Sequence, residues 1–183
     1  MERLKRSAIV LSLIERLREK GGWCGETHIQ KTTYFLQELL NVPLEFKFIL
    51  YKHGPYSFDL SDELMAMRAD MLIQLKSQQP YGPSIVPGPT SEQLKRLFPK
   101  TLRTYESRVR FIADQLANYG VADLERIATA FFIANESDMS TTTTQQMATK
   151  INRIKPHIST EQALKALETE SKLTTEAKEL LAV

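Results

Sequence analysis

The segment Tyr51–Ser57, which reads Tyr-Lys-His-Gly-Pro-Tyr-Ser, constrains the fold of this chain more than any other. It joins an alternating apolar run at 46–50 to an amphipathic helical pattern that begins near Asp59. Gly54 tolerates backbone conformations that other residues resist, and Pro55 fixes its own φ and lacks an amide donor. The sequence therefore predicts a sharp corner between a strand and a helix. The corner is a candidate functional surface, and a purely architectural turn with packed tyrosines is the competing interpretation.

Composition sets the broad class of the protein. With 183 residues, of which 42% are apolar, the chain can bury a core as one domain or two small ones. Cys24 is the only cysteine, which excludes an internal disulfide and a cysteine-based zinc cluster and fits a reducing compartment. The basic N-terminal stretch lacks a signal-peptide cleavage site, and no segment is long enough to span a bilayer. We therefore expect a cytoplasmic protein with no membrane partner.

Two helical patterns precede the corner. Apolar residues at positions 9, 13 and 17 predict a first helix that stops at two consecutive glycines, 21 and 22. A second helix follows Gly25 and ends at 41–43. The apolar stripe of this second helix leaves Gln30, Lys31 and Tyr34 on its other faces. We expect these three side chains to be exposed.

A third helix and two short strands follow the corner. Leu60, Leu64 and Met67 form a clean helical stripe. Segments 71–75 and 84–86 are strand candidates on either side of a turn-rich stretch at 78–83. Helices, a strand and a β-ribbon in this order are typical of a winged helix. We expect a winged-helix-like region with a small β-wing over residues 1–89.

The second half of the chain, 90–183, reads as helical. Thr90 and Ser159 each precede a glutamine by three residues, which predicts a capping box at two helix starts. Pro99 interrupts or restarts a helix, Gly120 breaks another, and the polar run 135–146 separates two more. The predicted fold class is mainly α (α+β), with the regions 1–89 and 90–183 packed as one compact unit.

The inventory of catalytic groups is small. The three histidines, His28, His53 and His157, stand in no recognised nucleophile or metal motif, and no glycine-rich phosphate loop is present. We predict no cofactor, no metal and no catalytic residue. Ser57 beside His53 is a weak hydrolase signal, and a role for Ser57 as the cap of the following helix is favoured. An enzyme of unknown reaction, dependent on His53, is the third-ranked interpretation.

Charge distribution bears on nucleic-acid binding. The formal net charge is only +2, and the third helix, which enters the major groove in winged-helix proteins, is acidic. If this acidic helix approached the DNA phosphates, it would not displace their counterions, so DNA binding would lose the free energy that counterion release supplies. DNA binding would instead use the wing and the basic segment 95–110, namely Lys95, Arg96, Lys100, Arg103, Arg108 and Arg110. A solvated face of an amphipathic helix explains the same charges. A DNA-binding transcriptional regulator is therefore the alternative function.

The aromatic corner is better suited to a protein partner. Tyrosine offers a large contact area and a polar handle at low entropic cost, and acidic residues beside it would steer a basic partner. Core packing of these tyrosines is the competing interpretation. The predicted partner-binding residues, on the second helix and the corner, are Gln30, Lys31, Tyr34, Tyr51, His53, Gly54, Pro55, Tyr56 and Ser57.

The motifs at 29–37 and 48–57 resemble those of a bacterial family, the YwgA-like proteins, and more distantly the SocA-like or Panacea-domain antitoxins. Segments 124–130 and 155–159 are also similar to the YwgA-like proteins, so the resemblance covers most of the chain. It implies an antitoxin that neutralises a toxin, or an adaptor that presents a partner to a protease. The implied signature positions are Gln30, Lys31, Tyr34, Gly54, Pro55 and Tyr56. His53, and Ile29 in place of leucine, depart from the usual pattern.

Together these observations predict a non-catalytic regulatory protein that binds a protein partner, with a toxin as one candidate, through the corner and the second helix. The sequence does not name the partner. It also leaves the oligomeric state open. The apolar stripes on the C-terminal helices would have the same periodicity whether they form the core of one chain or the interface between two chains.

Overall fold

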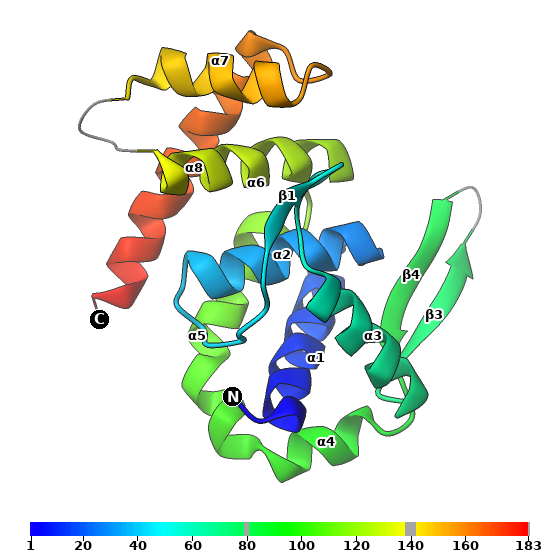
Figure 1. Ribbon diagram of the computed structural model, residues 1–183. Helices are drawn as coiled ribbons and strands as arrows, with labels where there is room; N and C mark the ends of the chain where they lie inside the picture. Colours follow the sequence, from blue (N-terminus) through cyan, green and yellow to red (C-terminus); the bar gives the residue numbers. More distant parts are fainter. Residues whose placement is uncertain (79–80, 138–141, 183) are drawn as a thin grey trace. The chain divides into compact units, whose positions relative to one another are not determined.

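The protein is mainly α-helical (Figure 1). The computed structural model describes residues 1–78, 81–137 and 142–182. Over these residues the chain is 67% helical, with eight helices and two small antiparallel sheets, which confirms the predicted fold class. Within the same described ranges, no helix is both long enough and apolar enough to cross a membrane.

The chain forms two compact units. Unit 1 consists of Met1–Phe48 and Ser57–Tyr119, and unit 2 consists of Ile49–Tyr56 and Gly120–Val183. This division differs from the expected boundary at residues 89 and 90. Segment 49–56, from the predicted corner, belongs with the C-terminal unit, although it lies in the middle of the N-terminal one along the chain.

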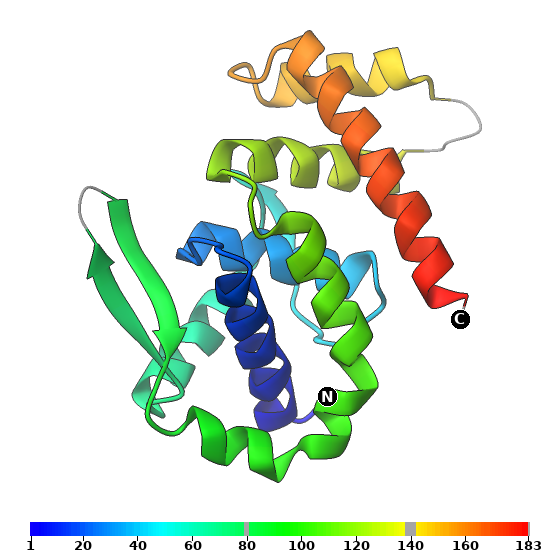
Figure 2. The ribbon, with the colours of Figure 1, turned by 180° about the vertical axis from the view of Figure 1, so that it is seen from behind.

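Unit 1 holds five helices and a β-ribbon among the described residues. Its elements are α1 (Arg3–Glu19), α2 (Glu26–Glu38), α3 (Phe58–Ala69), β3 (Ile73–Gln78), β4 (Tyr81–Pro87), α4 (Ser91–Leu97) and α5 (Pro99–Leu116). The apolar residues of α1 are buried along its length, from Ala8 to Leu17. Helix α5 runs beside α1, as Figure 2 shows from behind, and buries Val109, Ile112 and Leu116. This packing places α5 in unit 1 and moves the boundary beyond residue 89.

The predicted β-wing is present and longer than expected. Strands β3 and β4 pair antiparallel from Ile73↔Pro87 to Gln78↔Tyr81, with an irregularity between Lys76 and Gln78. Met71, expected to start the first strand, instead has a φ of 57° and lies in the turn after α3. Positions 79 and 80 of the predicted turn lie outside the described residues.

Unit 2 holds a hairpin and three helices in its described part. Its elements are β1 (Ile49–Tyr51), β2 (Gly54–Tyr56), α6 (Val121–Glu136), α7 (Thr144–Ile154) and α8 (Thr160–Leu181). Helices α6, α7 and α8 pack together around a core that includes Ile133, Met147 and Ile151. The capping box predicted at Ser159 is confirmed, and Thr143 forms a second one. Positions 138–141 of the predicted polar run lie outside the described residues.

Two local predictions were wrong. The strand predicted over 46–50 begins only at Ile49, because the backbone of Phe46 is bonded to a side chain instead. Its N–H donates to Gln37 Oε1, and its carbonyl oxygen accepts from Gln37 Nε2, at 2.9 Å each. The capping box predicted at Thr90 is absent. The Thr90 hydroxyl instead donates to the carbonyl of Asp70 at 2.8 Å, so it ties the start of α4 to the end of α3.

Candidate functional site

The predicted corner is a tight β-hairpin that packs on α6. Lys52 and His53 form its two-residue loop, because Tyr51 pairs with Gly54. Gly54 has a φ of 82°, a conformation that favours glycine. A Cβ at this position would lie 3.0 Å from Thr129 Oγ1 and 3.3 Å from the carbonyl oxygen of Glu125. A side chain at position 54 would therefore require its neighbours on α6 to shift by a few tenths of an ångström.

Lys155 fixes the same turn from the loop after α7. Its buried ammonium donates hydrogen bonds to the carbonyl oxygens of Tyr51 and, at 2.5 Å, Lys52. Burial lowers the pKa of Lys155, and the nearby Glu125 carboxylate opposes that shift. The two carbonyl groups at the loop thus receive a charged donor from a segment about a hundred positions further along the chain.

Glu125 connects the hairpin to the turn between α7 and α8. Its carboxylate is only 9% exposed, and its two oxygens lie 3.0 Å from His157 Nε2 and 3.5 Å from His53 Nδ1. Both imidazoles are largely exposed, at 56% for His157 and 62% for His53. One buried acid is therefore hydrogen-bonded to the exposed His157 and lies close to the exposed His53, which comes from a separate segment.

The exposed residues around this turn define a surface that we call the hairpin tip: Tyr51, Lys52, His53 and His157. Tyr51 is 52% exposed, and its ring lies 5.8 Å from that of Tyr56, centroid to centroid. The hairpin tip presents an aromatic ring, an ammonium and two imidazoles on a backbone held by α6 and Lys155. Such a surface can form hydrogen bonds and stacking contacts without first ordering its loop.

The remaining corner residues have structural positions. Gly54 and Pro55 are buried, and Tyr56 is half-buried. The hydroxyl of Ser57 accepts the amide N–H of Leu60 at 3.2 Å, which confirms its predicted role as the cap of α3. The corner is thus architectural at Gly54, Pro55 and Ser57, and exposed at the hairpin tip.

The predicted exposure of Gln30, Lys31 and Tyr34 was wrong. All residues from His28 to Leu36 are buried, so α2 has no open face along that stretch. The side-chain amide of Gln30 exchanges two hydrogen bonds with the backbone of Ser57, each of 2.9 Å. These bonds give Gln30 a structural role within unit 1. Helical periodicity missed this burial because polar side chains with buried partners look the same in sequence as solvated ones.

The six basic residues of 95–110 differ in their exposure and in their partners. Lys95 pairs with Glu15 at 3.0 Å and Glu92 at 2.7 Å; its burial lowers its pKa, but these carboxylates outweigh that effect and raise it. Arg108 donates to the carbonyl of Asn41 at 3.3 Å. Arg103 lines a hollow of about 350 Å³ whose other charged side chains are three acidic ones, Glu15, Glu19 and Glu106, and two basic ones, Arg16 and Lys95. Arg96, Lys100 and Arg110 are exposed.

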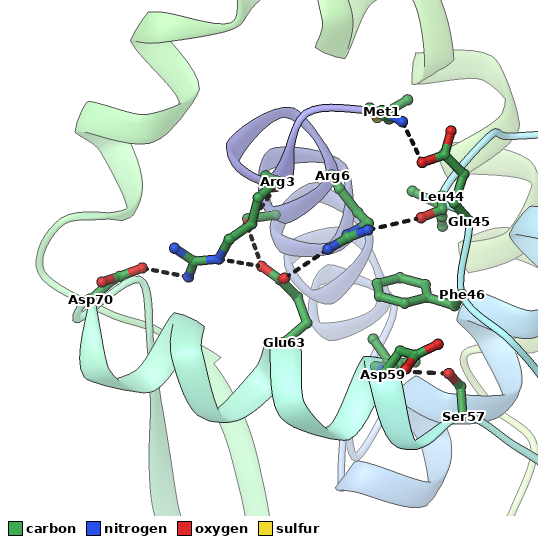
Figure 3. Close-up of polar contacts among 12 residues, drawn as sticks. Met1, Arg3, Arg6, Leu44, Glu45, Phe46, Ser57, Asp59, Glu63 and Asp70 are labelled. Atoms are coloured by element: carbon green, nitrogen blue, oxygen red, sulfur yellow. Dashed lines mark hydrogen bonds and ion pairs between the residues drawn. The ribbon is translucent and has the colours of Figure 1, made fainter.

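A second buried carboxylate, Glu63, holds α3 to α1 in unit 1 (Figure 3). Its oxygens accept the Ser7 hydroxyl at 2.5 Å and the guanidinium of Arg6 at 3.2 Å, and Arg3 Nε lies 3.4 Å away. Arg3 also bonds Asp70 at 2.6 Å, and this hydrogen bond raises the pKa of Arg3 against the effect of its own partial burial. The donors around Glu63 give the cluster a structural role.

Glu125, Lys155 and His157 were not predicted as site residues. The sequence places a lysine and a histidine around Pro156 between two helices, but nothing in the pattern pairs them with 51–54. Across the described ranges, no three or more histidine, cysteine, aspartate or glutamate side chains gather so as to hold a metal ion. No family model and no curated protein matches the chain.

Proposed function

We propose that this mainly α-helical protein is a non-catalytic regulatory protein, an antitoxin or an adaptor, that binds a protein partner through the hairpin tip. One observation carries the proposal. The exposed side chains of Tyr51 and His53 stand on a turn whose backbone is fixed by Lys155 and by close contact with α6, and His157 lies beside them, bonded to Glu125.

A fixed turn favours binding because the loop loses little conformational freedom when a partner docks. Tyrosine is enriched among the residues that dominate interface energies. The ammonium of Lys52 and the imidazoles of His53 and His157 add hydrogen-bond donors around the ring. A partner surface with an apolar pocket bordered by carbonyl or carboxylate oxygens complements this set.

The experiment compares what co-purifies with the protein from its native cell at low salt. The test variant is Tyr51→Ala combined with His53→Ala, and Tyr119→Ala removes a 38% exposed tyrosine of unit 1 as the matched control. We expect a stoichiometric protein partner with the parent protein and with Tyr119→Ala, and its loss with the double variant. Equal recovery of the partner with all three proteins would exclude the hairpin tip as its binding site.

DNA binding is the second candidate, favoured by the β3–β4 ribbon and by the exposed side chains of Arg96, Lys100 and Arg110. Recovery of DNA without a protein partner, released steeply by added salt, would support it. The variant Lys100→Glu with Arg110→Glu would then weaken retention, and the hairpin-tip variant would not. Catalysis would be supported instead by an activity that His53→Ala abolishes while the fold persists.

A further inference from the structure

Within the part of the chain that the structure describes, β3 pairs only with β4, so its other edge is free, and the direction of the backbone groups there follows from the pairing with β4. The amide of Ile85, on β4, donates to the carbonyl of Cys24 at 2.8 Å and so points away from β3. Leu75 lies directly opposite Ile85. Along an antiparallel pair of strands, two kinds of directly opposed residues alternate. In one kind the two residues exchange backbone hydrogen bonds, and in the other kind the N–H and C=O groups of both residues point away from the partner strand. The N–H and C=O of Leu75 therefore point outward from the free edge of β3.

A hollow of about 680 Å³ adjoins this strand. Met65, Arg68 and Ala69 of α3 form one wall, and Ile73, Gln74 and Leu75 of β3 form the other. All six residues belong to unit 1, where α3 packs against β3 (Figure 1). We call this hollow the α3–β3 groove.

Four of the six residues that line the α3–β3 groove are apolar, and Arg68 supplies its positive charge. Met65 and Leu75 are 56% and 43% exposed, which is high for large apolar side chains on the surface of a folded unit. Arg68 and Lys76 are exposed, and within the described part of the chain neither forms an ion pair. The acidic neighbour Asp70 is already paired with Arg3 at 2.6 Å. The free charge beside the groove is therefore positive.

We propose that the α3–β3 groove binds an extended segment of a protein partner, with alternating apolar and acidic side chains, by addition of a strand to β3. The segment's carbonyl accepts the Leu75 N–H, and its amide donates to the Leu75 carbonyl. One apolar side chain fills the space between Met65 and Leu75, and a carboxylate pairs with Arg68. An extended segment fits better than a helix because only an extended backbone can use the free edge.

This surface is separate from the hairpin tip and goes beyond the proposed function. The groove lies in unit 1, and the hairpin tip lies in unit 2. A negative result for peptide binding at the groove would therefore leave the proposal for the hairpin tip standing, and the reverse also holds.

The probe is a blocked synthetic peptide of the sequence Thr-Glu-Val-Glu-Leu-Glu-Val-Thr, titrated into the isotopically labelled full chain and followed by NMR. We expect the Leu75 amide signal to shift and its hydrogen exchange to slow by about tenfold or more on saturation, because the amide gains an acceptor. Arg68→Glu weakens binding by about tenfold through charge reversal. Arg110→Glu makes the same charge change on α5 and leaves the affinity unchanged.

Three results would overturn the proposal. The first is the absence of binding by this peptide at millimolar concentration. The second is binding that leaves the exchange of the Leu75 amide unaltered, or that Arg68→Glu and Arg110→Glu weaken equally. The third is a concentration-dependent dimer that protects the Leu75 amide without peptide, which would assign the edge to a second copy of the chain.

Discussion

Replacement of Gly54 by alanine tests how the hairpin packs on α6. The φ of 82° is a left-handed conformation, which costs a residue with a Cβ about 1–2 kcal/mol. The new methyl group would also lie 3.0 Å from Thr129 Oγ1 and 3.3 Å from the Glu125 carbonyl. Such crowding forces neighbours to move and adds about 1 kcal/mol or more. We therefore expect the hairpin to lose about 2–3 kcal/mol of local stability.

Native-state hydrogen exchange of the hairpin amides measures this loss directly. Exchange reports local opening, whereas a single global transition is not assured for a chain of two units. A loss of 2–3 kcal/mol corresponds to exchange that is about 30- to 150-fold faster. Gly82→Ala is the matched control, because a Cβ there meets nothing within 4 Å. It should leave the hairpin amides unchanged.

The variant Thr129→Ala separates the cost of the left-handed backbone at position 54 from the cost of crowding against α6. The Thr129 hydroxyl is buried and has no hydrogen-bond partner among the described residues, so its removal breaks no bond. In that background, Gly54→Ala should cost the backbone contribution of about 1–2 kcal/mol and the remaining contact with the Glu125 carbonyl at 3.3 Å, so the total loss should be smaller than in the parent background. Hairpin exchange that is the same in Gly54→Ala and in the parent protein would refute the packing described here.

Two further predictions concern buried groups of unit 1. Glu63→Ala removes the acceptor that the guanidinium groups of Arg3 and Arg6 share with the Ser7 hydroxyl, although each donor keeps a second acceptor, so urea unfolding should show a loss of about 1–3 kcal/mol; a loss below about 0.5 kcal/mol would contradict this role. Burial raises the pKa of Cys24 from its ordinary value of 9.0 to about 11. The unfolded thiol therefore ionises first, and stability should fall as the pH rises from about 9 to about 11. Cys24→Ala should remove this decline, and the same slope in both proteins would exclude Cys24 as its source.

The helices could be predicted because their signals are local. Apolar spacing and two glycines bounded α1, and Ser159 with Gln162 marked the start of α8. The same local pattern failed at Thr90, whose hydroxyl bonds the end of α3 instead. A capping signal is therefore reliable only where no tertiary acceptor competes for the hydroxyl.

The candidate site could be predicted only in part, because it depends on contacts between distant segments. Gly54 and Pro55 predicted a sharp turn, and Tyr51 and His53 were among the predicted binding residues, but the loop residue Lys52 was not. The convergence of Glu125, Lys155 and His157 on that turn was not predicted. The burial of Gln30 was missed for the same reason, because its hydrogen bonds go to the backbone of Ser57, 27 positions away. Single-sequence periodicity carries no information about such pairings.

The central claim is that the hairpin tip is a binding surface, and the most direct test is the affinity of the co-purified partner measured by titration calorimetry. If the account holds, Tyr51→Ala weakens binding by about 30-fold, the loss expected for a dominant interface tyrosine, and Tyr119→Ala leaves it unchanged. Unchanged affinity for Tyr51→Ala, with hairpin exchange as in the parent protein, would contradict the account.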